Sequence, residues 1–63
     1  MYNSELRHYQ YVNDYVKLYF FNGVIRYVKA SVFMENFHDF LDLSFEQIRN
    51  KYKIICYNFL INY

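Results

Sequence analysis

The chain has 63 residues, a formal net charge of +1 and an aromatic content of 25%, from nine Tyr and seven Phe. Its single cysteine excludes an internal disulfide, and one Cys with two His cannot supply the usual ligand spacing of a zinc site. No apolar run approaches the roughly 20 residues that span a membrane, and the polar segment 1–10 lacks the apolar region of a signal peptide. We therefore expect one small cytoplasmic domain, residues 1–63, with no metal and no cofactor.

The aromatic content is high for a core of this size. A domain of about 60 residues buries only about 60% of the surface of its unfolded chain. Each aromatic side chain can bury roughly 150–250 Å². We therefore expect part of the aromatic set on the surface or in an interface between proteins. The near balance of seven basic and six acidic residues indicates no strongly charged partner.

The first ten residues carry no clear periodicity. Ser4 has the chemistry of a helix N-cap, which favours a short helix after it. Chain ends without such an anchor are commonly frayed. Residues 1–10 are therefore expected to form either a short helix or a frayed end.

The clearest local signal is Asn22-Gly23, which stands between two β-rich runs, 15–21 and 24–30. Asn-Gly accepts the positive φ angles of a two-residue type I′ turn, whose twist matches that of the strands. The sequence therefore predicts a hairpin in which Leu18 faces Tyr27.

This register sorts the hairpin into two faces. The first face is apolar and is predicted to meet the core: Val16, Leu18, Phe20, Ile25 and Tyr27. The second face mixes aromatic, aliphatic and basic side chains: Tyr15, Lys17, Tyr19, Phe21, Val24, Arg26 and Val28. A face exposed only to water is expected to hold fewer aromatics.

A helix is predicted over residues 33–43, with Ser31 as its N-cap. Its apolar stripe has helical spacing: Phe33, Phe37, Phe40 and Leu41. Ser44 and Gln47 have the spacing of a capping box, which predicts a second short helical turn ending near Asn50.

The last apolar run, 52–61, favours a buried strand that pairs with the hairpin, with a helix as the alternative. The predicted fold is α+β: an antiparallel sheet of about three strands, made of the hairpin at Asn22-Gly23 and the C-terminal strand, with one main helix on one face. No predicted element covers the other face, which favours a homodimer or an obligate protein partner.

The sequence offers few groups for catalysis, and we expect no enzyme and no catalytic residue. Cys56 lies within the apolar last run and has the pattern of a buried structural thiol. His38 and Asp39 are neighbours, so on a helix they point about 100° apart and do not form a pair. Glu35, Asp39 and Asp42 place an acidic edge on the helix, which either faces water or meets a basic groove of a partner.

The mixed hairpin face has two interpretations. Its aromatic and basic residues are typical of a stacking platform for single-stranded nucleic acid, and the alternatives are cross-strand packing with Arg26 over Tyr19 or a dimer interface. The residues concerned are Tyr15, Lys17, Tyr19, Phe21 and Arg26. The net charge of +1 argues against a binder driven by electrostatics.

Residues 12–53 resemble the short dimeric uracil-DNA glycosylase inhibitors of protein-primed podophages. The matching segments are 15–20 (YVKLYF), 25–29 (IRYVK), 34–41 (MENFHDFL) and 44–48 (SFEQI). The family has the same order of strand, turn, strand, helix and short acidic turn. The resemblance implies a homodimer that occupies the DNA-binding groove of the enzyme and captures its inserting leucine in an apolar pocket.

By position, Phe37 matches the helix aromatic of that family, and Phe40 or Leu41 falls where its second pocket aromatic lies. The resemblance makes Glu35 an acidic contact, while His38 stands where the family has glutamate. The family is also acidic and this chain is near neutral, so mimicry of DNA by charge carries over less well than an apolar pocket.

The leading hypothesis is therefore a phage-type inhibitor of a host DNA-repair enzyme, uracil-DNA glycosylase, acting in the host cytoplasm. The predicted partner-binding residues are Glu35, Phe37, His38, Phe40, Leu41 and Asp42. The alternatives are a small single-stranded nucleic-acid binder and a phage antagonist of another host nuclease or polymerase.

Overall fold

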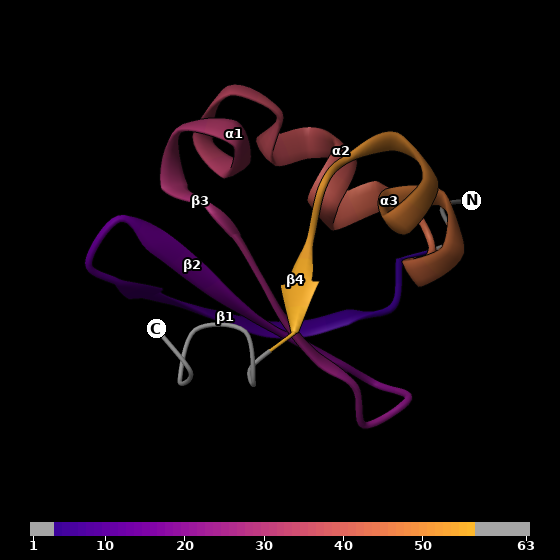
Figure 1. Ribbon diagram of the computed structural model, residues 1–63. Helices are drawn as coiled ribbons and strands as arrows, with labels where there is room; N and C mark the ends of the chain where they lie inside the picture. The colour runs from indigo at the N-terminus through magenta and orange to yellow at the C-terminus, as the bar shows by residue number, and fades with distance from the viewer. Residues whose placement is uncertain (1–3, 57–63) are drawn as a thin grey trace.

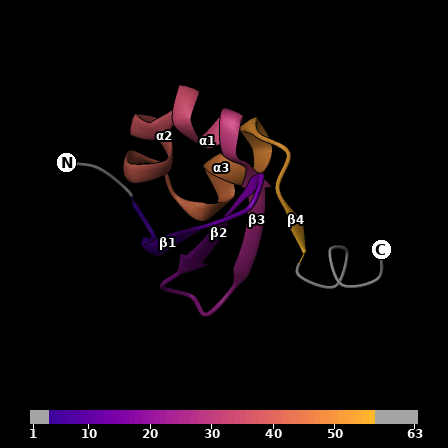
Figure 2. The ribbon, with the colours of Figure 1, turned by 90° about the vertical axis from the view of Figure 1, so that its left-hand side faces the viewer.

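The computed structural model describes residues 4–56. The elements of these residues are β1 (Leu6–Val12), β2 (Tyr15–Phe20), β3 (Ile25–Lys29), α1 (Ala30–Glu35), α2 (Phe37–Asp42), α3 (Phe45–Lys51) and β4 (Ile55–Cys56). The described strands pair in the order β1-β2-β3-β4, and every pair is antiparallel. The helices lie together on one side of the sheet (Figure 1, Figure 2), which confirms the predicted α+β class.

The N-terminal segment is a strand, where we expected either a short helix or a frayed end. β1 pairs with β2 from Leu6 to Val12. Asn13 has a φ of 56° and helps to close the two-residue connection to Tyr15, because asparagine tolerates this left-handed region better than most residues. The expectation for residues 4–10 is therefore wrong, and β1 is the outermost strand of the described sheet.

The β2–β3 hairpin is present, but its turn has three residues where we predicted two. The N–H of Phe20 donates to the carbonyl of Val24 at 3.0 Å, and the N–H of Gly23 donates to the carbonyl of Phe20 at 3.0 Å. Gly23 has a φ of 87°, whereas Asn22 has no positive φ. A type I′ turn requires positive φ at both central residues and is therefore excluded. The Asn22 side-chain oxygen instead accepts a hydrogen bond from the N–H of Val24 at 2.9 Å.

The third turn residue shifts the hairpin register by one position. Leu18 lies opposite Arg26, where we predicted Tyr27, and Val16 lies opposite Val28. A shift by one residue exchanges the two faces of a strand. Val28 therefore joins the core, while Tyr27, although buried, points to the side of the sheet away from the helices, the outer face. The predicted faces are confirmed for β2 and wrong for β3.

The predicted helix over 33–43 is broken in two at Asn36. α1 ends at Glu35 and α2 begins at Phe37. The Asn36 side-chain nitrogen donates to the carbonyl of Val32 at 3.0 Å. The Asn36 backbone N–H donates to the same carbonyl at 3.1 Å, and the Asn36 φ of −127° departs from helical geometry. The single main helix of the prediction is therefore replaced by two short ones.

The two predicted helix starts have different outcomes. Ser31 lies inside α1, whose N-terminus has no side-chain cap, so that prediction is wrong. The capping box is confirmed, because the Ser44 hydroxyl accepts from the N–H of Gln47 and the Gln47 side chain accepts from the N–H of Ser44. α3 ends at Lys51, one residue beyond the predicted Asn50.

The core lies between the sheet and the helices. Its buried residues are Val16, Leu18, Phe20, Val28, Phe33, Phe40 and Ile48. Phe33 is central, since its ring centroid lies 4.9 Å from that of Tyr9 and 5.2 Å from that of Phe40. Aromatic pairs at such distances add to the stabilisation from buried area.

The predicted C-terminal strand is present only at Ile55–Cys56, and residues 52–54 of that prediction are not strand. Ile55 pairs with Tyr27 and Cys56 pairs with Arg26, both antiparallel. Residues 57–61 of that prediction lie outside the described residues. Residues 53 and 54 lead into β4 without pairing with β3, so the chain diverges from β3 at this point.

Candidate functional site

The break between α1 and α2 leaves an exposed hollow of about 350 Å³. The residues that line it are Met34, Glu35, Asn36, Phe37, His38 and Asp39. Glu35, Phe37 and His38 belong to the predicted partner-binding set. The helix break thus gathers half of that set around one depression.

The apolar part of the hollow comes from Phe37 and Met34. Phe37 is half-buried, and its ring packs on the core with centroids 5.9 Å from Tyr9 and 5.4 Å from Phe33. Met34 is 63% exposed. The hollow therefore joins a ring held in place from below to a flexible thioether side chain that can adapt to a partner.

The other predicted binding residues lie outside the hollow. Phe40 has no exposed surface and stacks on Tyr52 with ring centroids 4.9 Å apart. Its predicted role as a wall of an open pocket is therefore wrong in this conformation. Leu41 is half-buried and Asp42 is exposed. Met34 was missed because the helical stripe was assigned across Asn36 without a break.

One acid of the hollow is engaged within the protein. The carboxylate of Asp39 accepts hydrogen bonds from Lys51 Nζ, at 2.8 Å, and from the Tyr52 hydroxyl. These bonds, first that from Lys51 and then that from Tyr52, lower the pKa of Asp39. The predicted acidic edge also includes Glu35 and Asp42, which form no ion pair with the described residues. These two carboxylates therefore carry the unpaired negative charge of the edge.

A second candidate surface is the Tyr19 cluster on the outer face, made of Arg7, His8, Lys17 and Tyr19. Lys17 Nζ lies 5.1 Å and the Arg7 guanidinium carbon 5.8 Å from the centroid of the Tyr19 ring. The His8 ring centroid is 5.3 Å from the same ring, tilted by 37°. Cations at these distances are attracted to the ring face. Arg7 and His8 are additions that the sequence interpretation missed, because β1 itself was missed.

The structure divides the predicted outer-face set. Tyr15, Lys17 and Tyr19 alternate along β2 and share the outer face. Arg26 does not lie over Tyr19, because the shifted register places it opposite Leu18 on the other side of the sheet. Phe21 is 70% exposed in the turn between β2 and β3.

The small net charge is unevenly divided between the strands with their loops and the helices. The strands and loops carry five cations against two acids, a balance of +3: Arg7, Lys17, Arg26, Lys29 and Lys53 against Glu5 and Asp14. The helices carry four acids against two cations, a balance of −2: Glu35, Asp39, Asp42 and Glu46 against Arg49 and Lys51. The argument from net charge against a polyanionic ligand is therefore weaker for the strands and loops than for the helices.

No family model, curated protein or solved structure matches the chain. No helix within residues 4–56 is long and apolar enough to cross a membrane. The same residues hold no group of three or more His, Cys, Asp or Glu side chains that suits a metal ion. The α1–α2 hollow and the Tyr19 cluster are the candidate binding surfaces.

Proposed function

We propose that this protein is a non-catalytic inhibitor that binds a partner protein through the α1–α2 hollow. The observation that carries the proposal is the gathering of Phe37, Met34 and Glu35 around one exposed depression. An apolar acceptor with an acidic rim suits a partner that inserts one apolar side chain from a basic surface.

The hollow is large enough to admit one apolar side chain of a partner. Its volume of about 350 Å³ is near the lower end of the roughly 300–1,000 Å³ typical of ligand pockets. One aliphatic side chain from the partner would contact the Phe37 ring and the mobile end of Met34. Glu35, exposed at the rim, would face the cations of a DNA-binding groove.

The resemblance of residues 12–53 to podophage inhibitors supplies the specific target, uracil-DNA glycosylase of the host, and its inserting leucine as the captured side chain. Inhibition then results from occupation of the DNA-binding groove, and no residue of the inhibitor reacts. An antagonist of another host nuclease or polymerase would use the same hollow with a different inserted side chain.

The test is a uracil-excision assay with purified protein in excess over the enzyme. We expect excision to be suppressed, and we expect Met34→Asp to restore it, because a carboxylate would enter the apolar part of the hollow. Phe21→Asp is the matched control, since Phe21 is also an exposed apolar side chain but lies in the β2–β3 turn. Undiminished excision at micromolar protein would reject uracil-DNA glycosylase as the target.

The homodimer that the resemblance implies is also part of the proposal. β1 is the outermost described strand and carries two exposed large apolar side chains, Tyr11 at 53% and Val12 at 37%. Exposed edge strands of this kind favour pairing with a second chain. Sedimentation analysis of the wild type against Tyr11→Lys tests this, and a monomer at all concentrations would remove the dimer.

A second function is favoured by the charge of the sheet side and the Tyr19 cluster, and we propose it as the alternative. One base of a single-stranded nucleic acid would stack on Tyr19, with phosphates near Arg7 and Lys17. Fluorescence anisotropy with a labelled oligothymidine should show binding that weakens steeply with salt. Binding that is unaffected by Tyr19→Ala would contradict this assignment.

A further inference from the structure

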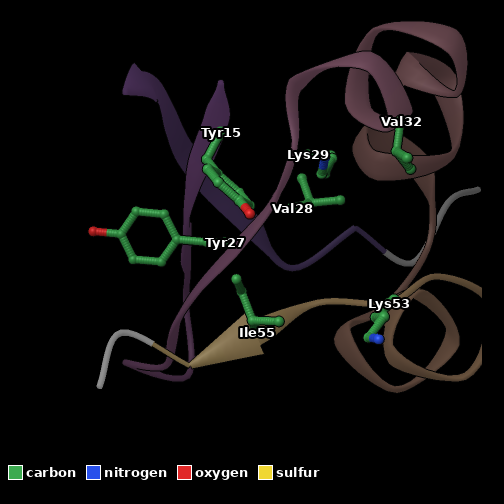
Figure 3. Close-up of a pocket in the computed structure, with 7 residues that line it drawn as sticks. All are labelled: Tyr15, Tyr27, Val28, Lys29, Val32, Lys53 and Ile55. Carbon is green, nitrogen blue, oxygen red and sulfur yellow. The ribbon is translucent and has the colours of Figure 1, made fainter. Parts of the chain in front are cut away.

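A crevice of about 340 Å³ lies where β4 leaves β3 (Figure 3). β4 pairs with β3 only at Arg26 and Tyr27, so the following residues of β3, Val28 and Lys29, run on beside the unpaired approach to β4. The residues that line this crevice come from β2, β3, α1, β4 and that approach. The crevice shares none of them with the α1–α2 hollow.

Two cations stand at the crevice without an internal counter-charge. Lys29 and Lys53 are both exposed, and neither ammonium group forms a hydrogen bond or an ion pair with the described residues. None of the described lining residues is acidic. An anion in the crevice would interact favourably with both ammonium groups.

The rest of the lining is apolar and aromatic. Val28, Val32 and Ile55 supply aliphatic surface, and Tyr15 and Tyr27 supply rings. In Figure 3 the two tyrosines lie on one side of the crevice and the two lysines on the other. A matching ligand therefore has a flat ring at one end and a negative charge at the other.

We propose that this crevice binds a nucleotide, with the base against Tyr15 and the aliphatic surface and the phosphate between Lys29 and Lys53. Stacking on tyrosine tolerates any base because every base has a π face. The source of the nucleotide is either the free monophosphate or one unit of a single strand. The inference is independent of the proposed inhibitor function, and for the alternative function it adds a subsite next to the Tyr19 cluster.

The test is an NMR titration that follows the methyl groups of Val28, Val32 and Ile55. Thymidine 5′-monophosphate should shift them in a saturable manner, whereas thymidine alone and inorganic phosphate alone should bind more weakly. Changing Lys29 and Lys53 together to Gln should weaken binding of the monophosphate by about tenfold, since two charge-assisted contacts are lost. Changing Arg49 and Lys51 together to Gln removes the same charge from α3 and should leave the affinity unchanged.

An oligothymidine arm separates the two sources. Tighter binding of the oligomer than of the monophosphate, at the same methyl groups, assigns the crevice to a strand, while equal affinity assigns it to the free nucleotide. Tyr19→Ala should weaken binding of the oligomer and leave binding of the monophosphate unchanged. This variant therefore tests the Tyr19 cluster separately from the crevice. The inference would be overturned if millimolar monophosphate caused no saturable shift of the methyl signals. It would also be overturned if the Lys29 and Lys53 double variant bound the monophosphate as tightly as the wild type.

Discussion

The Tyr52 hydroxyl donates a hydrogen bond to the carboxylate of Asp39 and thereby ties the end of α3 to α2. Lys51 donates to the same carboxylate oxygen at 2.8 Å. The Tyr52 ring also stacks on the buried Phe40, at an interplanar angle of 29°. One residue at the C-terminal end of α3 therefore holds α2 through both a polar and an apolar contact.

Removal of this hydroxyl should loosen the joint between the two helices. We expect Tyr52→Phe to lower the urea midpoint, because the Asp39 carboxylate then loses a partner in a partly buried position while the ring contact with Phe40 remains. Lys51→Gln should have a smaller effect, because its ion pair is exposed to solvent. A larger loss for Lys51→Gln would show that the ion pair is the stronger contact.

The same joint should respond to pH in a defined direction. The pKa of Asp39 is lowered in the folded protein by the hydrogen bonds from Lys51 and Tyr52. Its contribution is therefore complete above the ordinary range of an aspartate and is lost as the pH falls through that range to the lowered pKa. The stability difference between the wild type and Asp39→Asn should shrink over this acidic window. A difference that stays constant there would contradict the assignment.

At alkaline pH the joint should weaken for two other reasons. Burial, followed by the bond to Asp39, raises the pKa of Tyr52, and the bond to Asp39 raises the pKa of Lys51. Groups with a raised pKa stabilise the fold below their ordinary range and lose that contribution as the pH rises through the raised value. The free energies of unfolding of the wild type and of Tyr52→Phe should therefore converge as the pH rises through the alkaline range. Equilibrium denaturation at several alkaline pH values measures both.

The β2–β3 turn can be tested by two alanine substitutions. Gly23→Ala should destabilise the protein by roughly 1–2 kcal/mol, because a residue with Cβ is strained in the left-handed region, although the space around the added atom is empty. Asn22→Ala should cost less, since Asn22 has no positive φ and loses only an exposed hydrogen bond. Thermal unfolding measures both. Equal and large losses would instead favour a two-residue turn.

The N-terminus of α3 is held by a cap from its own chain segment and by a distant residue. Ser44→Ala should cost about 1 kcal/mol, typical of a lost N-cap. Glu5 also reaches this end, since its carboxylate accepts from the N–H of Phe45 at 2.7 Å. Glu5→Gln should therefore lower the stability further when combined with Ser44→Ala. Chemical denaturation of the single and double variants measures the contributions.

The centre of the core gives the largest expected effect. Phe33→Ala should cost about 3–5 kcal/mol, which removes much of the stability of a domain this small. Phe33→Leu should cost less because it leaves a smaller cavity. Far-ultraviolet circular dichroism during denaturation distinguishes the two. A mild effect of Phe33→Ala would mean that Tyr9 and Phe37 close over the vacated volume.

Local sequence signals anticipated the elements that depend on neighbours in the chain. The capping box of Ser44 and Gln47 and the alternation along β2 both depend on contacts within a few residues, and both predictions hold. The α+β class followed from the order of these elements.

The missed features depend on one extra residue or on distant contacts. Asn22-Gly23 marked the hairpin correctly, but the pair alone does not decide between turns of two and three residues, and the difference reverses the faces of β3. Asn36 interrupts a stripe with good helical spacing because its backbone leaves the helical conformation at a φ of −127°. β1 gains its strand structure from pairing with β2, which weak local propensity does not show. The candidate hollow arises at the Asn36 break, whereas the crevice arises where β4 diverges from β3.

The strands and loops carry a charge balance of +3 and the helices a balance of −2, so a polyanion attracts the first and repels the second. For the nucleic-acid binding proposed as the alternative function, this uneven charge would favour the approach of the strands and loops to the polyanion before contact. This attraction acts over about one Debye length, about 8 Å at physiological ionic strength. Added salt would therefore slow productive encounters before it weakens the contacts themselves.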